Sequence, residues 1–487
     1  MDIPGTPSVT AADAVSLDAA FTHLSPRIRP RRPPLSSHGV HLAVLALTLT
    51  VLSGAFFFHG MLVWSAGLTF IAYDTFLLLF VASKTLVLRS PIVRPDATLP
   101  SLTMGVVVAA YNEATVLERT IESLLAQEVP PDVILIADDG STDATAALLA
   151  ERYGFPVPHR NGIAITSPRH PCLRWLRAPH GGKAITLNRA FPQLGTDLIV
   201  TVDADTLLAP DALAQMRLAF AAEPKLVAAS GVLSPVCDPS PTGKVLQWFQ
   251  TYEYVRNFMA RFAWMRADSL LLISGAFAAF RSKALLAVGG FDPECLVEDY
   301  EVIHRLYRHS AEQGLDWRVR VVGRALARTS APSTLPGFFR QRRRWFAGFL
   351  QTQYWNRDMT GNRKFGKLGT LMLPVKTVDT VQPFCGITAL LGLLLLAVGH
   401  RTGELHSVLT VIAIKLSLDL AFNTWWIFLY RRWTHQPKSP RLIPALAATL
   451  LEPLLFQPLR HIGALLGWYH FLTGRRHWEQ QQRHAMT

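Results

Sequence analysis

The chain has 487 residues, 50% of them hydrophobic, so it exceeds the usual size of a single core and is too apolar for an ordinary soluble enzyme. Lys and Arg number 48 against 35 Asp and Glu, a formal net charge of +13, which suits anionic phosphates, lipid headgroups or nucleic acids. No Cys-x-x-Cys pair occurs among the four cysteines, so neither a zinc cluster nor a disulfide framework is indicated. We therefore expect a membrane protein with one sizeable domain in water, facing the reducing cytosol.

The N-terminal region divides into a tail and a hairpin. Residues 1–39 are rich in Pro, Ser and Ala, end in the basic run "PRIRPRRPP", and predict a disordered basic tail rather than a signal peptide. Residues 40–95 contain two nearly uncharged stretches, 41–58 and 61–82, each long enough to cross a hydrocarbon layer of roughly 30 Å. Arginines and lysines precede the first stretch and follow the second. The positive-inside rule then places both ends of this transmembrane hairpin in the cytosol.

Residues 96–366 have the pattern of an α/β domain. Short β-branched runs such as "MGVVVAAY", "DVILIAD" and "DLIVTVDAD" alternate with helix-like stretches, which predicts βα units on a mostly parallel sheet. In such sheets the ligand lies beyond the carboxyl ends of the strands. Because the runs finish in "YNE", "DDGSTD" and "DAD", we expect these three acidic endings to meet in one cleft.

Apolar character returns in residues 367–474. Stretches 384–399 and 407–430 predict two membrane spans, and the basic residues after the second place the loop that follows in the cytosol. The last stretch, 442–472, has Pro453, Pro458, Arg460 and His461 in its middle. These residues predict a re-entrant hairpin or a helix lying on the membrane surface. Residues 475–487 are expected to form a basic cytosolic tail.

The motif "TVDADT" contains the first candidate metal ligands. Asp203 and Asp205 stand two apart at the end of an expected strand, where both carboxylates can reach a hard divalent cation, Mg²⁺ or Mn²⁺, that also bridges two phosphates. Taken alone, the pair favours a solvated turn, and the apolar strand before it strengthens the metal role.

Two further strand endings supply candidate nucleotide ligands. A carboxylate at Asp138 or Asp139 can accept a hydrogen bond from a nucleobase imide, and the ring of Tyr111 can pack on a base. The alternative is N-capping of the helix-like "ATAALLAERY", which we favour for Asp143.

Two more segments contain single candidate residues. In "HGGKAITLN" the glycines let the backbone approach a ligand and Lys183 can face a diphosphate, although an ordinary loop lysine is the alternative. In "GGFDPECLVEDYE" the carboxylate of Asp299 can take the proton of an attacking hydroxyl. Its alternative role, shared with Glu298, is the acidic first turn of a helix.

Together, the ordered segments "YNE", "DDGSTD", "GGKA", "DAD", "VED" and "QRRRW", set between membrane segments, resemble the processive branch of glycosyltransferase family 2. Cellulose, hyaluronan, chitin-oligosaccharide and poly-N-acetylglucosamine synthases belong to that branch. The resemblance implies a GT-A fold, that is, a Rossmann-like, mostly parallel cytosolic α/β domain inserted between transmembrane helices. It also implies a UDP-sugar donor, a divalent cation and inversion at the anomeric carbon.

The resemblance also assigns roles to particular residues. Asp139, with Asp138 and Tyr111, would hold the uridine, and Lys183 would lie near the donor diphosphate. Asp203 would bridge nucleotide and metal, Asp205 would ligate the metal, and Asp299 would be the general base. The Gln-x-x-Arg-Trp signature is matched by Gln341, Arg344 and Trp345.

Three consecutive arginines, Arg342 to Arg344, overlap that signature, and their positive charges need a binding partner. Arg344 can stabilise the departing UDP, and the indole of Trp345 offers a face on which the acceptor sugar can stack. For Arg342 or Arg343 we expect attraction to lipid headgroups instead.

We expect a multi-pass enzyme of a bacterial-type inner membrane that extends a β-linked polysaccharide, with UDP-N-acetylglucosamine as the first expected donor and UDP-glucose the next. Small membrane or periplasmic subunits are potential partners. One alternative is a non-processive transferase acting on a lipid acceptor, and another is a non-catalytic receptor or export partner. Nucleic acid is not expected as a partner, because the basic residues lie beside membrane spans. The ionisable residues Asp74, Lys415 and Asp419 within spans either line a polysaccharide channel or pair with one another.

Overall fold

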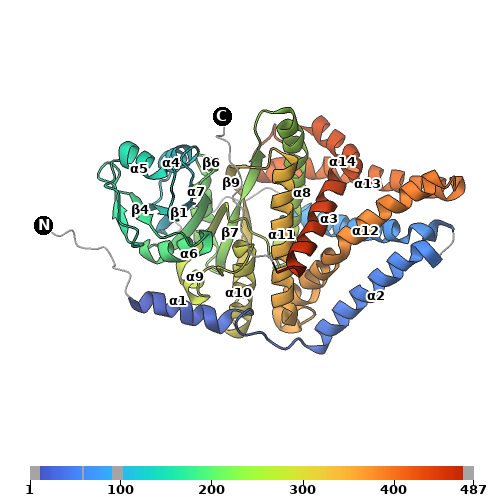
Figure 1. Ribbon diagram of the computed structural model, residues 1–487, viewed down its shortest axis with the longest axis horizontal. Helices are drawn as coiled ribbons and strands as arrows, with labels where there is room; N and C mark the ends of the chain where they lie inside the picture. Colours follow the sequence, from blue (N-terminus) through green and yellow to red (C-terminus); the bar gives the residue numbers. More distant parts are fainter. Residues whose placement is uncertain (1–10, 58–59, 90–101, 475–487) are drawn as a thin grey trace.

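The computed structural model describes residues 11–57, 60–89 and 102–474, with a sheet domain beside a group of long helices (Figure 1). The predictions for residues 1–10, for 90–101 and for the basic tail at 475–487 lie outside the described residues.

The domain is built on a nine-stranded sheet of order β3-β4-β2-β1-β5-β8-β7-β9-β6. Strands β3, β8 and β6 run opposite to the other six, so the mostly parallel sheet predicted from the sequence is confirmed. The strands are β1 Met104–Ala110, β2 Val133–Asp138, β3 Ala164–Thr166, β4 Leu173–Arg177, β5 Leu198–Asp203, β6 Thr206–Leu208, β7 Leu226–Val236, β8 Phe277–Arg281 and β9 Arg318–Ser330.

The register of the central strands places the acidic endings at one edge. Strands β1, β2 and β5 are almost wholly buried, which is why they read as continuous apolar runs rather than alternating ones. Ala110 of β1 pairs with Asp138 of β2, and Ala109 pairs with Asp203 of β5. Two of the predicted carboxylates therefore flank the end of the same central strand.

Helices connect these strands and flank the sheet. Helix α6 packs against β1 and β2, α9 against β8, and both α7 and α8 contact β7 and β9. The helices of this domain are α4 Leu117–Leu125, α5 Thr145–Tyr153, α6 Lys183–Ala190, α7 Ala212–Ala222, α8 Pro241–Arg266, α9 Ser282–Ala287, α10 Glu298–Glu312 and α11 Leu335–Trp355.

Five of the described helices are long and apolar enough to cross a membrane, as judged by length and composition. The chain is accordingly a membrane protein. These helices are α2 Leu35–Phe57, α3 Ser65–Thr85, α12 Leu373–Val398, α13 Thr402–Thr434 and α14 Leu442–Leu472.

The re-entrant hairpin, one of the two forms expected for the last stretch, is not what the structure contains. Helix α14 is continuous, with Pro453 and Pro458 inside it, and it packs along α11 (Figure 1). The charge that suggested a break is compensated, because Arg460 lies 3.3 Å from a carboxylate oxygen of Glu253 and 3.0 Å from one of Glu452. A paired arginine can remain in a packed helix.

The prediction of disorder for residues 1–39 is wrong for the described part of that segment. Ala11–Leu24 forms helix α1, which lies beside α9 and α10 (Figure 1). The Arg27 guanidinium donates to both carboxylate oxygens of Asp292 at 3.0 Å. The composition indicated a chain without a core of its own, but ion pairs with the domain supply the missing contacts.

The ionisable residues inside the spans contact one another. The ammonium of Lys415 on α13 lies 2.6 Å from a carboxylate oxygen of Asp74 on α3 and also pairs with Asp419. These contacts favour mutual pairing, which joins two helices, over the channel alternative.

Candidate active site

The loop before α6 is organised around Asp139. The carboxylate accepts hydrogen bonds from the backbone N–H groups of Gly181 (2.8 Å) and Gly182 (2.9 Å) and from the Thr186 hydroxyl (2.7 Å). Nδ1 of His180 lies 2.9 Å from the same carboxylate. Asp139 is only 3% exposed, so its oxygens are occupied by the loop rather than presented to a base. Uridine was the contact expected for this residue, and the structure shows a loop anchor.

Beside this loop, Tyr111 forms a stacked pair with His180, with ring centroids 4.2 Å apart and planes at 20°. Asp138 is fully buried, and its Oδ1 accepts a hydrogen bond from the Ser141 N–H at 2.8 Å. Its Oδ2 lies 3.4 Å from Nε of Arg177. Tyr111 thus packs against the loop before α6, and the buried Asp138 holds the "DDGST" turn through its hydrogen bond with Ser141.

Lys183 links the strand endings to helix α10. It is the first residue of α6, and its ammonium lies 2.7 Å from Oδ1 of Asp203 and 3.3 Å from Oε1 of Glu298. Burial by itself would lower the pKa of Lys183, but the two carboxylates raise that pKa above its ordinary value. The lysine therefore stays charged between the end of β5 and the start of α10.

Asp299 is held beside this lysine by backbone. Its Oδ2 accepts a hydrogen bond of 2.7 Å from the Gly275 N–H. A Cβ at Gly275 would lie 3.1 Å from the Asp299 side chain, which explains why a glycine stands there. Burial and the negative charge of Glu298 raise the pKa of Asp299, against the opposing charge of Lys183. A carboxylate with a raised pKa is suited to accept a proton near neutral pH.

Helix α11 places the Gln-x-x-Arg-Trp residues next to the Asp299 loop. Nη1 of Arg344 donates to the Leu296 carbonyl at 3.1 Å, three residues before the candidate base. Trp345 is half-buried and packs against the main hydrophobic core. Gln341 is buried, and its Oε1 accepts no hydrogen bond from the described residues.

The expected lipid contact of the arginine run is wrong for Arg342. Its guanidinium forms a bidentate pair with the carboxylate of Glu253 on α8, at 2.8 and 2.6 Å. The side chain is 12% exposed, so it faces protein rather than headgroups. The sequence could not show this, because Glu253 lies far away along the chain.

The carboxylates fit a hard divalent cation only together with a ligand. No group of three or more His, Cys, Asp or Glu side chains in the described parts of the chain is arranged to hold a metal. Asp203 and Asp205 offer oxygen donors from the end of β5, the donor type that Mg²⁺ and Mn²⁺ prefer. Phosphate oxygens of a bound nucleotide would have to complete the coordination.

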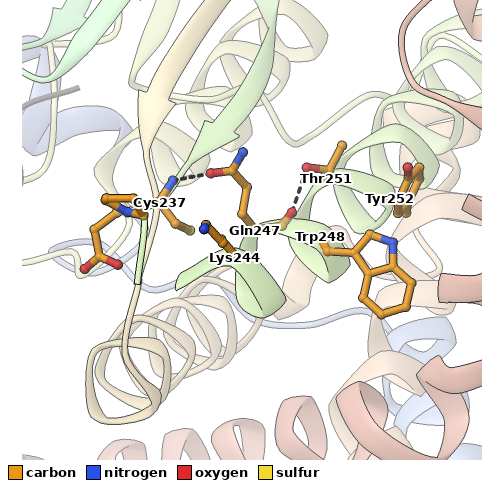
Figure 2. Close-up of a pocket in the computed structure, with 8 residues that line it drawn as sticks. Cys237, Lys244, Gln247, Trp248, Thr251 and Tyr252 are labelled. Atoms are coloured by element: carbon orange, nitrogen blue, oxygen red, sulfur yellow. Dashed lines mark hydrogen bonds between the residues drawn. The ribbon is translucent and has the colours of Figure 1, made fainter. Parts of the chain in front are cut away.

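The pocket drawn in Figure 2 is lined by none of these residues and has a volume of about 380 Å³. It is lined by residues 237–239 and by the first turns of α8, among them Lys244, Trp248 and Tyr252. Its aromatic side chains bind backbone, since Trp248 Nε1 donates to the Pro444 carbonyl at 2.9 Å and the Tyr252 hydroxyl donates to that of Arg441 at 3.3 Å. These hydrogen bonds join α8 to the start of α14, so we assign the pocket to the packing of these helices and not to the active site.

Sequence reasoning missed two contributors to the site. His180 stacks on Tyr111 and contacts Asp139, and its position directly before the two glycines was the available signal. Gly275 positions Asp299 from 24 residues away, and no local pattern marks it.

This arrangement of acidic strand ends, a glycine-flanked lysine and a helix carrying Gln-x-x-Arg-Trp defines a class of sugar-transferring proteins. Residues 100–348 match the family model described as "Glycosyltransferase like family 2", and the chain belongs to that family. The resemblance noted in the sequence is thus confirmed.

Among curated proteins, the chain is similar to poly-beta-1,6-N-acetyl-D-glucosamine synthases. It is 30% identical over 275 residues to that of Staphylococcus epidermidis, covering 56% of this chain and 60% of the relative. It is 28% identical over 257 residues to that of Staphylococcus aureus strain COL, covering 52% and 57%. The matched region therefore spans somewhat more than half the length of these relatives.

A solved mannosyltransferase from Pyrobaculum calidifontis, in complex with GDP-mannose and Mn²⁺, has a similar structure. The TM-score is 0.52 at 21% identity, over 85% of this chain and 99% of the other. At this identity the likeness shows the fold alone. With the family match, it confirms the expected GT-A fold.

Proposed function

We propose that this chain is an inverting glycosyltransferase that moves N-acetylglucosamine from UDP-N-acetylglucosamine to a growing β-linked polysaccharide. The observation that carries the proposal is the position of Lys183 between Asp203 and Glu298, next to Asp299. This contact joins the donor-side strand ending to Glu298, the residue directly before the candidate base. The similarity to poly-beta-1,6-N-acetyl-D-glucosamine synthases supports this sugar over glucose.

The proposed chemistry is a single displacement. The oxygen of an acceptor hydroxyl forms a bond to the anomeric carbon while the bond from that carbon to the diphosphate oxygen breaks. The hydroxyl proton passes to the Asp299 carboxylate, whose raised pKa favours acceptance. UDP leaves with the bonding electrons, and Lys183 and Arg344 offset its negative charge.

Residues around the loop bind the donor. Asp203 and Asp205 would hold Mg²⁺ or Mn²⁺ together with the diphosphate, and the cation would supply charge neutralisation of the leaving group. Tyr111 would pack on the uracil ring, and Asp138 would shape the base pocket from beneath. Asp139 would act on the donor through the loop it anchors, because its hydrogen bonds to the Gly181 and Gly182 N–H groups fix the backbone that leads into Lys183 at the start of α6.

Acceptor binding would use helix α11. Trp345 would stack on the terminal sugar of the acceptor. Gln341, whose Oε1 lacks a partner among the described residues, would accept a hydrogen bond from a sugar hydroxyl. The chain would act as a multi-pass protein of a bacterial inner membrane with its sheet domain in the cytosol. Small membrane or periplasmic subunits would be its partners.

The proposal is tested by UDP release from the detergent-purified chain with Mg²⁺ or Mn²⁺, comparing UDP-N-acetylglucosamine with UDP-glucose, UDP-glucuronate and UDP-galactose. We expect release with the first donor and a polymeric product. In Asp299→Asn the rate should fall by roughly a hundred- to ten-thousandfold, because the variant lacks the general base that accepts the hydroxyl proton. Asp316→Asn is the matched control, because Asp316 is exposed and pairs with Lys225 away from the site.

Other results would redirect the assignment. A chloroform-soluble product carrying one sugar would favour a lipid acceptor. Full activity in Asp299→Asn would refute the assigned base. No release with any donor would point to a missing partner or activator, or to a non-catalytic receptor.

A further inference from the structure

Arg342 lies against the indole that we assign to the acceptor. Its guanidinium carbon is 4.9 Å from the centre of the Trp345 ring and 4.7 Å from that of Phe338. All three residues belong to α11 at helical spacings of three and four, so their side chains share one face of the helix. The orientation of Trp345 is therefore coupled to that of Arg342.

Glu253 fixes the plane of that guanidinium. Both of its carboxylate oxygens accept hydrogen bonds from Arg342, at 2.8 and 2.6 Å. A bidentate pair of this kind holds a planar guanidinium in one orientation, which a single contact does not. The carboxylate lies on α8 and its side chain is 3% exposed, so water does not compete for the pair.

A second arginine keeps this carboxylate charged and in place. Nε of Arg460 on α14 lies 3.3 Å from Oε1 of Glu253. Burial alone would raise the pKa of Glu253, yet the charges of Arg342 and Arg460 hold the pKa below its ordinary value. Through these two arginines Glu253 joins α8, α11 and α14 close to Trp345.

We propose that Glu253 is a positioning residue for acceptor binding: through Arg342 it sets the tilt of the Trp345 ring on which the acceptor sugar stacks. The inference rests on the proposed function, because it takes Trp345 as the acceptor platform. Glu253 itself touches neither donor nor acceptor in this scheme. Its loss should therefore weaken acceptor binding and leave donor binding unchanged.

The test is calorimetric titration of the purified full-length chain in detergent with an N-acetylglucosamine oligosaccharide, without donor. Against wild type, Glu253→Gln and Arg342→Lys are both expected to bind about tenfold more weakly, a size ordinary for coupled residues in contact. Arg342→Lys keeps the charge and removes the planar fork, so it tests orientation in a chain that retains its ion pair.

Asp358→Asn is the matched control for loss of a buried bidentate pair, since Asp358 holds Arg308 of α10 at 2.7 and 2.9 Å and contacts neither Glu253 nor Arg342. Acceptor affinity in this variant should equal that of wild type even if its melting temperature falls. A double-mutant cycle with Trp345→Ala completes the test, because Glu253→Gln should have no further effect on acceptor affinity when Trp345 is absent.

The inference would be overturned by undiminished oligosaccharide binding in Glu253→Gln and Arg342→Lys, or by no oligosaccharide binding by wild type. Full additivity with Trp345→Ala would do the same. UDP release in the same samples reports on the proposed function separately. A chain that releases UDP but binds acceptor equally well in all variants would retain the function and lose the positioning role.

Discussion

At the scale of single residues, Asp139 shows how a buried carboxylate can act on a ligand through the backbone. It accepts hydrogen bonds from two consecutive glycine N–H groups and one hydroxyl, and Gly182 has a left-handed φ of 94°. The carboxylate therefore holds the loop in a conformation that favours glycine and that leads directly into Lys183. The sequence marked Asp139 as chemically important but could not show this route, because its partners lie more than forty residues away.

We predict that Asp139→Asn raises the KM for the UDP-sugar by about tenfold or more, because an amide group then faces N–H donors and each charge-assisted bond contributes roughly 1.5–3 kcal/mol. UDP-release kinetics at varied donor concentration provide the measurement. Asp143→Asn is the control: Asp143 accepts from Thr145 N–H and Ala114 N–H, so its loss should lower the melting temperature slightly and leave the KM unchanged. Equal KM values in both variants would contradict the anchoring role.

A second residue-scale prediction concerns pH. Activity needs Asp299 unprotonated, and its pKa is raised by burial and by Glu298. The acid limb of kcat/KM should therefore lie above the ordinary Asp value of about 3.9. In Glu298→Gln the like charge is gone, so the pKa of Asp299 falls and the acid limb should move to lower pH. The measurement is a pH profile of UDP release, and an upward shift or none would count against Glu298 as the cause.

At the scale of elements, the contact between α11 and α14 depends on glycine. A Cβ at Gly463 would lie 2.6 Å from Cβ of Arg342, and one at Gly467 would lie 2.7 Å from Cβ of Phe346. Both glycines thus let α14 approach α11 closely, as small residues do between membrane helices. Helix α14 remains one helix despite two prolines, a result that local propensity alone argued against.

We predict that Gly463→Ala destabilises the chain by about 1–3 kcal/mol, because the added methyl group forces the two helices apart. Gly403→Ala is the control, since no atom lies within 4 Å of its ideal Cβ position, and its unfolding temperature should be unchanged or slightly higher. Thermal unfolding in detergent, followed by intrinsic fluorescence, compares the two. Equal melting temperatures for the two variants would contradict the close contact between α11 and α14 at Gly463.

At the scale of the whole molecule, features that depend on local sequence pattern could be predicted, whereas features that depend on contacts between distant segments could not. The buried strands β1, β2 and β5 were visible as apolar runs because both faces of a parallel sheet are covered. Their acidic endings could be placed at one edge for the same reason. The order of α1 could not be foreseen, because its partners, such as Asp292 for Arg27, belong to a segment 265 residues later. Neither composition nor periodicity contains that information.

The pair between Arg27 and Asp292 gives the last prediction. Asp292 lies in the segment that leads to Asp299, and Asn188 of α6 holds the same segment through both the N–H and the carbonyl of Phe291. Arg27→Asp places two carboxylates in contact, so α1 should detach, at a cost of about 1–3 kcal/mol given that Arg27 is 28% exposed.

Hydrogen exchange should then rise in both residues 11–32 and residues 289–299, with kcat for UDP release several-fold lower and donor KM unchanged. The double variant Arg27→Asp with Asp292→Arg restores the opposite charges and should recover most of the protection and rate. If exchange rises in the N-terminal segment alone while kcat stays at the wild-type value, then α1 covers the domain without steadying the segment that carries the base.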